Sequence, residues 1–363
     1  MHMHHLNFKL RDTQITMTYS LKTAFDAAKV LLAAGEIPNI IGPVGSGKTS
    51  RVRTELAPFW AEHTGKKETK VWWIPCNAIT PEDILVYALN DGELVPHVTS
   101  ALPKDGGKND NFSSIIVFDD YTKSNKALDG IVSSLTLERK LLGTTYELAD
   151  HVAIVFTGNR LRDRAGDRKL PTHLVNRLST IEVEFTEEDY RTWKTHAHKT
   201  GVDPRVVAWS NYFTPLLKEQ EPDELGRQIT PRSVTKLGRV LANTPAELVL
   251  PVAESFIGKG GALELNSFIS VCSDLPNISD IIRAPLDTKP VSRLDILHIV
   301  VTSLVNKCSS NADVAASLQF IERCNAGREL INLFVRDLLS AKPELLQTEA
   351  ITRWKTDNAD INI

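Results

Sequence analysis

Short apolar runs, bounded by glycine, proline or polar residues, recur through the first half of the chain. This pattern predicts buried strands. The runs lie at residues 37–41, 70–75, 115–118, 152–156 and 181–185. Before the first run, apolar residues recur at helical spacing from Ser20, a capping residue, to Gly35, and helical segments are also expected between the runs. The first half of the chain is therefore expected to alternate between strands and helices.

Four further segments of this half have local signals. Thr80–Asp83 has Thr as N-cap, Pro at the first position and acids in the first turn, which predicts the start of a helix. Residues 91–113 are rich in glycine and predict an exposed loop. A helix is expected at about 125–137, and a hairpin around Gly143.

After residue 185 the pattern becomes helical and stays so. Residues 294–305 and 328–339 predict two amphipathic helices. Prolines interrupt the segment before them. We interpret the end of the chain as a helical extension that packs on the preceding helices or recruits a partner.

Composition narrows the class of protein. The chain has 363 residues, of which 42% are hydrophobic and 24% charged, as in soluble globular proteins. Its net charge of −3 gives no general attraction to nucleic acid or acidic membranes. The four cysteines form no C-x-x-C pair, which argues against a zinc site or a disulfide framework. We see neither a membrane-spanning run nor a signal peptide, and we expect a cytoplasmic protein.

Residues 42–49 contain the strongest chemical motif. They fit G-x-x-x-x-G-K-[ST] and follow a predicted strand, as a phosphate-binding loop requires. Backbone N–H groups of such a loop cradle phosphates, its lysine reaches the β- and γ-phosphates, and its threonine binds Mg²⁺. The predicted nucleotide-binding residues are Gly42, Pro43, Val44, Gly45, Ser46, Gly47, Lys48, Thr49 and Ser50.

Two carboxylates follow the apolar run at 115–118. The carboxyl ends of strands in open α/β sheets are where ligands bind. We therefore expect Asp119 to bind Mg²⁺ through water, and Asp120 to orient or deprotonate the attacking water. Asn159 follows the next apolar run. It could hold that water or the γ-phosphate if the two strands are neighbours, although a plain turn asparagine is equally compatible with its position.

In their order along the chain, these motifs resemble the AAA+ ATPases, most closely the MoxR-like branch. The resemblance rests on the phosphate loop, on residues 115–120, on Glu138–Leu141 before a Gly-Thr-Thr-Tyr-Glu-Leu hairpin, and on Thr157–Asn159. It runs from about residue 20 to 245 and implies an α/β fold: an AAA+ P-loop NTPase core, with a parallel sheet between helices, followed by an all-helical lid. With the helical C-terminal extension that the pattern predicts, the expected divisions are a tail at 1–18, a nucleotide-binding domain at 19–185, a lid at 186–248 and an extension at 249–363.

The same resemblance assigns roles to single residues. Asp119 and Asp120 are similar to the Walker B acids, and Asn159 to sensor 1. Arg177 resembles the arginine finger, which would reach the γ-phosphate bound by a neighbouring subunit. Arg232 resembles sensor 2. It follows the N-cap Thr230 and Pro231, so it lies in the first turn of a helix, where a cation is disfavoured by about 0.3–1 kcal/mol unless an anion faces it.

Two features depart from the family, and a third leaves the function open. Asp120 stands where the family usually has glutamate, so the base is expected about 1.5 Å further from the water, and hydrolysis is expected to be slower. Tyr121–Lys123 stands where this branch typically has Ile-Asn-Arg. One loop is rich in basic residues. We interpret it as a subunit contact or a solvated loop rather than a nucleic-acid grip. Its basic residues are Arg160, Arg162, Arg164, Arg168 and Lys169.

Three functions compete at this point. The first is a homo-oligomeric, hexameric ring that uses ATP and Mg²⁺ to remodel a protein substrate or adaptor, which in this family often carries a von Willebrand A domain. The second is a nucleic-acid motor or the nucleotide-binding subunit of a DNA-processing complex. The third is a slow ATP-dependent switch or scaffold. Near-neutral charge and the hairpin favour the first, Asp120 supports the third, and no membrane association is expected.

Overall fold

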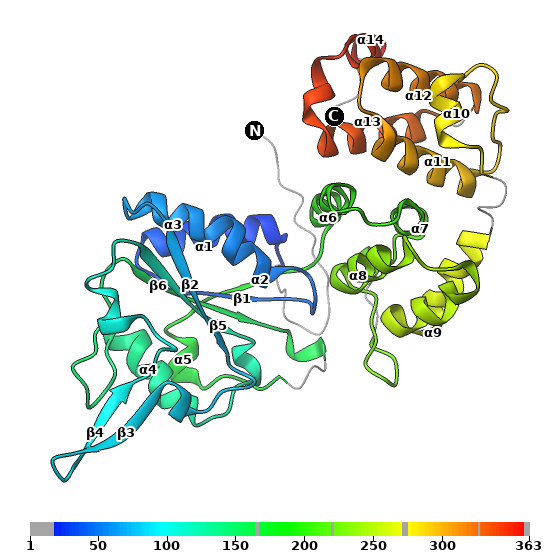
Figure 1. The fold of residues 1–363 in the computed structure, drawn as a ribbon. Helices are drawn as coiled ribbons and strands as arrows, with labels where there is room; N and C mark the ends of the chain where they lie inside the picture. The colour runs from blue at the N-terminus through cyan, green and yellow to red at the C-terminus, as the bar shows by residue number, and fades with distance from the viewer. Residues whose placement is uncertain (1–17, 164–166, 219–220, 271–274, 326, 359–363) are drawn as a thin grey trace, which may run out of the picture. The chain divides into compact units, whose positions relative to one another are not determined.

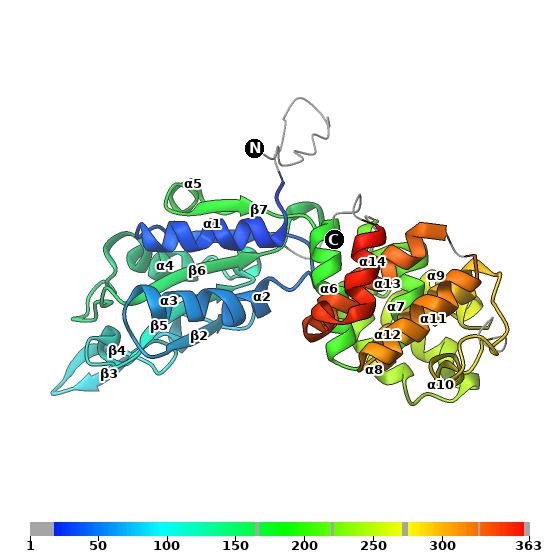
Figure 2. The same ribbon diagram turned by 90° about the horizontal axis from the view of Figure 1, so that it is seen from above.

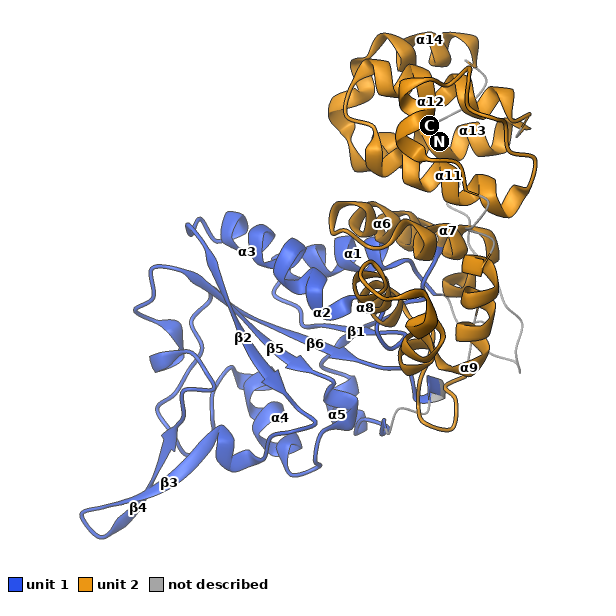
Figure 3. Ribbon diagram, turned by 45° about the vertical axis from the view of Figure 1, so that its right-hand side comes forward, with its two compact units in different colours: residues 1–186 blue, residues 187–363 orange. Residues whose placement is uncertain are grey.

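The computed structural model describes residues 18–163, 167–218, 221–270, 275–325 and 327–358. The chain divides into two compact units, Met1–Thr186 and Glu187–Ile363, called unit 1 and unit 2 below (Figure 3). Unit 1 holds the strands, whereas the described residues of unit 2 form helices, turns and loops. The predicted tail, apart from residue 18, lies outside the described residues. The predicted division of the helical half at residue 248 stays a prediction.

Unit 1 is built on a five-stranded parallel sheet in the order β2-β5-β6-β1-β7. Its strands are β1 (Pro38–Ile41), β2 (Thr69–Pro75), β5 (Ser113–Asp119), β6 (Val152–Gly158) and β7 (Ser179–Glu182). Each matches a predicted run, although β7 begins earlier and ends before residue 185. Beyond β7, Val183 makes a single bridge to Tyr19. The predicted parallel sheet between helices is confirmed.

Helices cover both faces of this sheet, as Figures 1 and 2 show. The helices of unit 1 are α1 (Leu21–Ala33), α2 (Lys48–Arg51), α3 (Ala57–His63), α4 (Leu128–Glu138) and α5 (Thr172–Val175). Successive strand residues point to opposite faces. Ile115 and Val117 therefore pack with α1 and α3, whereas Ile116 and Phe118 pack with α4. The apolar run of β5 is buried on both faces, which explains why it is apolar throughout.

One prediction in this unit is wrong. Thr80 does cap a turn, but η2 (Pro81–Asp83) is a single 3-10 turn and no helix follows it. The chain instead forms an antiparallel hairpin of β3 (Leu85–Asn90) and β4 (Glu93–Val98), within what was expected to be helix and loop. Asp91 and Gly92 both have positive φ, which matches a type I′ hairpin turn. This hairpin extends away from the sheet of unit 1 (Figure 1).

The remaining connections of unit 1 are short. They contain the 3-10 turns η3 (Lys104–Gly107), η4 (Tyr121–Lys123) and η5 (Leu161–Asp163). The predicted hairpin around Gly143 is present, with a bridge between Lys140 and Glu147. The helical run after the phosphate loop is continuous from Lys48 to His63, and its middle turn η1 (Val52–Leu56) is a π-helix.

Unit 2 confirms the predicted helical second half. Its helices are α6 (Glu187–Lys199), α7 (Pro204–Phe213), α8 (Pro231–Leu241), α9 (Val249–Ser270), α10 (Ile278–Arg283), α11 (Leu294–Lys307), α12 (Asn311–Arg323), α13 (Gly327–Ala341) and α14 (Glu349–Asp357), with 3-10 turns η6 (Pro215–Leu217), η7 (Ala246–Leu248) and η9 (Pro343–Gln347). Thr230 caps α8 through a reciprocal bond with Ser233, and Pro231 occupies its first position, as the sequence predicts.

The C-terminal helices of unit 2 pack against its first helices. Helix α11 lies along α7, and α13 contacts α6. The buried pair Lys194 and Asp337 joins α6 to α13, with Nζ 2.7 and 3.0 Å from the two carboxylate oxygens. His198 of α6 and Asn306 of α11 form a 2.6 Å hydrogen bond. Among the described residues, no helix is long and apolar enough to cross a membrane.

Candidate functional site

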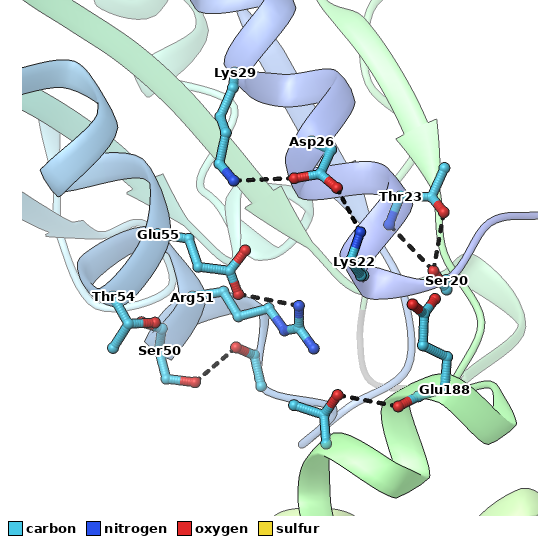
Figure 4. A network of polar contacts seen from close by, with 12 residues as sticks. Ser20, Lys22, Thr23, Asp26, Lys29, Ser50, Arg51, Thr54, Glu55 and Glu188 are labelled. Atoms are coloured by element: carbon cyan, nitrogen blue, oxygen red, sulfur yellow. Dashed lines mark hydrogen bonds and ion pairs between the residues drawn. The ribbon is translucent and has the colours of Figure 1, made fainter. Parts of the chain in front are cut away.

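The phosphate-binding loop joins β1 to α2 at the carboxyl end of the sheet. Gly45 and Gly47 have φ of 70° and 103°, values that glycine adopts without strain. Gly42 lies against Val183, since a Cβ atom at Gly42 would come within 2.1 Å of Val183 Cγ2. Ser50 donates a 2.7 Å hydrogen bond to the Gly47 carbonyl, as Figure 4 shows. The first glycine of the loop is thus held against Val183, and the end of the loop is held by the Ser50 hydrogen bond.

Lys48 is buried, with 6% of its surface exposed. Its Nζ donates to the Gly42 and Pro43 carbonyls at 2.9 and 2.8 Å, and it lies 3.4 Å from Asn159 Oδ1. A buried ammonium needs such oxygen partners. The lysine is therefore held at the loop, in contact with the end of β6.

Asp119, at the end of β5, gathers three donors. Thr49 Oγ1 lies 3.3 Å from its Oδ1, and Thr157 Oγ1 donates to the same oxygen at 2.5 Å. Trp73 Nε1 donates to the other oxygen at 3.2 Å. Thr49 and Asp119 present the hard oxygen ligands that Mg²⁺ prefers, next to the loop that would hold phosphates. These residues fit a magnesium–nucleotide complex.

Asp120 follows in the left-handed conformation, with φ of 50°. This conformation is uncommon for a residue with a side chain, although aspartate tolerates it better than most. Asn159 Nδ2 donates to Asp120 Oδ1 at 3.2 Å, and Lys123 Nζ lies 3.7 Å from Oδ2. Strands β5 and β6 are neighbours, which was the condition for Asn159 to reach the site. Lys48, Asn159 and Asp120 form a continuous polar chain.

A second polar network fixes the segment after Asp120. Tyr121 is buried and its hydroxyl donates to Asp129 at 2.6 Å; burial, with this contact, raises the pKa of Tyr121 far above its usual range. Arg168 bonds Asp129, the Ser124 carbonyl and the Ser124 hydroxyl. Thr122 donates to Asp167. The loop after β6 is thereby tied to the loop after β5.

Cys76 lies near the two carboxylates and stays a thiol. Burial, with smaller contributions from Asp119 and Asp120, raises its pKa far above the usual range. A thiol of this kind is a poor nucleophile because the reactive form is the thiolate. The chemistry of this site therefore depends on oxygen and nitrogen groups.

The two predicted arginines lie in different units. Arg177, just after α5, is half-buried, and its Nη1 donates to the Ser133 carbonyl of α4 at 2.9 Å. Arg232 lies at the exposed first turn of α8 in unit 2, where no carboxylate of the described residues pairs with it. Within unit 1 the structure thus brings together Lys48, Thr49, Asp119, Asp120 and Asn159, without Arg177. The roles of Arg177 and Arg232 stay predictions.

The basic loop after Asn159 is partly neutralised from within the chain. Arg160 forms a nearly buried ion pair with Asp163, with 10% and 11% of the two side chains exposed. Arg168 pairs with Asp129 as described above. Arg164 and the Arg162 side chain lie outside the described parts of the structure. Two of the five cations are therefore engaged in holding the loop itself.

Sequence reasoning missed two residues of the Asp119 cluster. Thr157 belongs to the Thr-Gly-Asn segment noticed in the sequence, but only the pairing of β5 with β6 shows that it faces Asp119. Trp73 lies on β2, where it pairs with Val117, two residues before Asp119. Its register depends on a pairing between strands far apart in the chain. An apolar run ending in two acids could not indicate it.

Comparison with known proteins agrees with this geometry. Residues 39–178, from β1 to just past α5, match the family model described as "AAA domain (dynein-related subfamily)". No match was found among curated proteins.

Solved structures show similarity at low identity. A mutant RuvB of Thermotoga maritima is 14% identical over 84% of this chain and 85% of its own, with a TM-score of 0.35. NtrX of Brucella abortus is 15% identical over 90% of this chain and 69% of its own, with a TM-score of 0.40. Similarity of this degree carries nothing about function.

Proposed function

We propose, from the AAA domain that residues 39–178 carry, that this chain is an AAA+ protein that binds ATP and hydrolyses it to ADP and phosphate. The observation that carries the proposal is the convergence of Lys48, Thr49, Asp119, Asp120 and Asn159 at one end of the sheet. These groups lie at the start of α2 and at the ends of β5 and β6, and they would supply donors for phosphates, ligands for Mg²⁺ and a base for water.

Binding is assigned to the loop. Backbone N–H groups of residues 44–47 would face the phosphates, and Lys48 would exchange its carbonyl partners for the β- and γ-phosphate oxygens. Thr49 and Asp119 would hold Mg²⁺, which would supply charge neutralisation for the phosphoryl group. Thr157 and Trp73 keep the Asp119 carboxylate oriented.

Hydrolysis is assigned to Asp120 and Asn159. Asp120 accepts a proton from the attacking water or orients it, and the Asn159 amide, already 3.2 Å from Asp120 Oδ1, holds the carboxylate in place. Asn159 also contacts Lys48, so it can sense the γ-phosphate through the same amide. Asp120 has one methylene fewer than glutamate, so we expect turnover to be slow.

The finer assignment is a MoxR-like ring. It is supported by the hairpin around Gly143 and by the position of Arg177 after α5. In this proposal six copies form a cytoplasmic ring, Arg177 completes the site of a neighbouring copy, and Arg232 contacts the phosphates. The ring remodels or assembles a protein partner, for which an adaptor with a von Willebrand A domain is one candidate.

Asp120 also favours a second function, a slow ATP-dependent switch. Its side chain is one methylene shorter than glutamate, which limits how far it reaches toward water. In a switch, ATP binding would assemble the ring and hydrolysis would reset it rarely. Multiple turnovers that disappear in Arg177→Ala would favour the remodelling ring over the switch.

Two substitutions test the site assignment. Lys48→Ala is expected to weaken ATP binding by at least about tenfold, because a charge-assisted contact to phosphate is lost. Asp120→Asn is expected to keep binding and to abolish turnover, because the amide cannot accept the proton. Binding is measured with a fluorescent ATP analogue and turnover as phosphate released.

The exposed Lys67 gives the matched control, since Lys67→Ala changes the charge equally without touching the loop. Undiminished hydrolysis in either site variant would refute the assignment.

A further inference from the structure

Unit 2 contains a cavity of about 450 Å³ that the nucleotide site does not involve. It lies between the first helices of the unit and its C-terminal helices, with walls from α6, α7, α11 and α13. Its volume is within the range of small-molecule sites in proteins. Among the residues that line it are Asn211, His298 and Arg336.

Two side chains of its wall carry buried polar atoms without a partner among the described residues. Asn211 Oδ1 accepts a 2.9 Å hydrogen bond from the Tyr190 hydroxyl, which leaves its Nδ2 donor unused. His298 Nδ1 is likewise unused. An unused buried donor or acceptor destabilises the protein. Both atoms are covered in this conformation, so a ligand bonds them once the two side chains turn toward the cavity, and that bond would recover the cost.

The charges of the wall leave one cation unmatched. Lys194 is neutralised by Asp337 behind the wall, and Arg191 lies 3.7 Å from Glu187. Arg336 is half-buried, and no carboxylate within the described part of the chain pairs with it. The acids that line the cavity, Glu187 and Glu329, are exposed residues. The Arg336 guanidinium offers five hydrogen-bond donors in a planar fork.

We infer that this cavity binds a small molecule with a carboxylate or phosphate group, which the Arg336 guanidinium and the Asn211 amide hold. A guanidinium fork recognises both anions through two parallel hydrogen bonds. The rest of the ligand lies against Leu217, Leu330 and Leu333, and the His298 ring offers it a further hydrogen-bonding atom. Because Asn211 belongs to α7 and Arg336 to α13, the ligand stabilises the packing of the C-terminal helices on the first helices of the unit.

Calorimetric titration of the full chain with three probes tests this inference: succinate, citrate and inorganic phosphate. At least one probe is expected to bind and to raise the melting temperature. Arg336→Gln is expected to weaken that binding at least about tenfold, because the fork is lost. Asn211→Asp keeps the acceptor for Tyr190 but replaces the donor by a negative charge, so it is expected to abolish binding. Binding of succinate but not phosphate would identify a carboxylate ligand. Binding of phosphate but not succinate would identify a phosphorylated ligand.

Arg353→Gln is the matched control, because Arg353 belongs to the same unit and 85% of its side chain is exposed. Inorganic phosphate can also bind the phosphate loop at Lys48. This adds a heat signal to the titration that neither Arg336→Gln nor Arg353→Gln changes. Equal affinity in wild type and Arg336→Gln overturns the inference. So does the absence of binding for all three probes up to about 10 mM, which is weaker than a specific small-molecule site. The melting temperature without probe shows whether each variant is folded.

Discussion

Gly42 is the residue at which packing leaves least freedom in the phosphate loop. It packs against Val183, the residue that follows β7. Strand β7 is at the edge of the sheet, on the opposite side of β1 from β5. A methyl group at position 42 would overlap Val183 Cγ2. The first glycine of the loop is thus required by a neighbour that lies far away in the sequence.

Gly42→Ala is therefore expected to destabilise the protein by about 1–3 kcal/mol, as overpacking does. Val183→Ala removes the overlapping atom, so the double variant should lose less stability than the two single variants together. Urea unfolding measures all three. Gly130→Ala is the control: Gly130 lies in helix α4, nothing is within 4 Å of an added Cβ, and alanine should stabilise the helix by up to about 1 kcal/mol. Additive losses at positions 42 and 183 would contradict the overlap.

The residues of the site were predictable from sequence to different degrees. Lys48 and Thr49 follow from spacing within one motif, because a phosphate loop is a local structure. Asp119 and Asp120 follow from an apolar run that ends in acids. Thr157 and Trp73 meet Asp119 only through strand pairing. The left-handed backbone of Asp120 also had no sequence signal, since aspartate adopts it only where its surroundings require it.

Among the elements, helices α6 and α13 of unit 2 are joined by a buried ion pair. Lys194 and Asp337 are 6% and 7% exposed in their side chains. A buried ion pair contributes little net stability, but either charge without its partner is costly.

Lys194→Met or Asp337→Leu alone is expected to lower the free energy of unfolding by about 3–5 kcal/mol, because one buried charge is left uncompensated. The double variant should lie within about 1 kcal/mol of wild type, because both charges are gone and apolar atoms fill the space. Urea unfolding of the full chain provides the values. Arg353→Gln breaks the exposed pair with Asp357 and should change little. A double variant as unstable as the single variants would contradict the prediction, because an uncompensated charge could not then explain the single losses.

Elements were predictable where their pattern was long or their signal local. The five strands of the sheet follow from apolar runs, and α8 follows from its cap. The β3–β4 hairpin was missed because Thr80–Asp83 has every local mark of a helix start, and those marks also suit the single turn that forms. Asp91-Gly92 was the available signal for the hairpin. The alternation beside it is weak, since Val86, Tyr87, Leu89 and Leu94 are all exposed apolar residues.

At the scale of the whole molecule, the proposed function needs a second copy to complete the site. Arg177 contacts the Ser133 carbonyl in its own chain, and it lies outside the Lys48–Asn159–Asp120 chain of contacts. If it serves a neighbouring copy, loss of Arg177 and loss of Lys48 damage different partners of one interface.

Arg177→Ala and Lys48→Ala are each expected to lack turnover alone and to regain some when mixed. In a random equal mixture about one interface in four joins an intact loop to an intact arginine, so about a quarter of wild-type turnover is expected. Phosphate release from pre-mixed subunits measures it. Lys67→Ala mixed with Lys48→Ala shows how dilution alone affects the rate. If the mixture of the two site variants stays inactive while each still assembles, Arg177 acts within its own chain.

The cavity of unit 2 shows which part of the molecule the sequence could not predict. Its wall combines α6 and α7, which end by residue 213, with α11 and α13, which begin only at residue 294. Amphipathic patterns predicted that these segments are helical. They contain no information on which helices pack together, because that choice depends on side-chain shape.

The hydrogen bond between Trp73 and Asp119 couples tryptophan fluorescence to the proposed metal site. The emission of an indole depends on the partner of its N–H group, and this indole donates to the carboxylate expected to face Mg²⁺. Adding Mg²⁺ and ATP should therefore shift tryptophan fluorescence, and Trp73→Phe should remove that shift although five of the six tryptophans remain. An unchanged shift in Trp73→Phe would assign the signal to another tryptophan. The chain thus carries an optical reporter that can follow occupancy of its own site during turnover, without any attached dye.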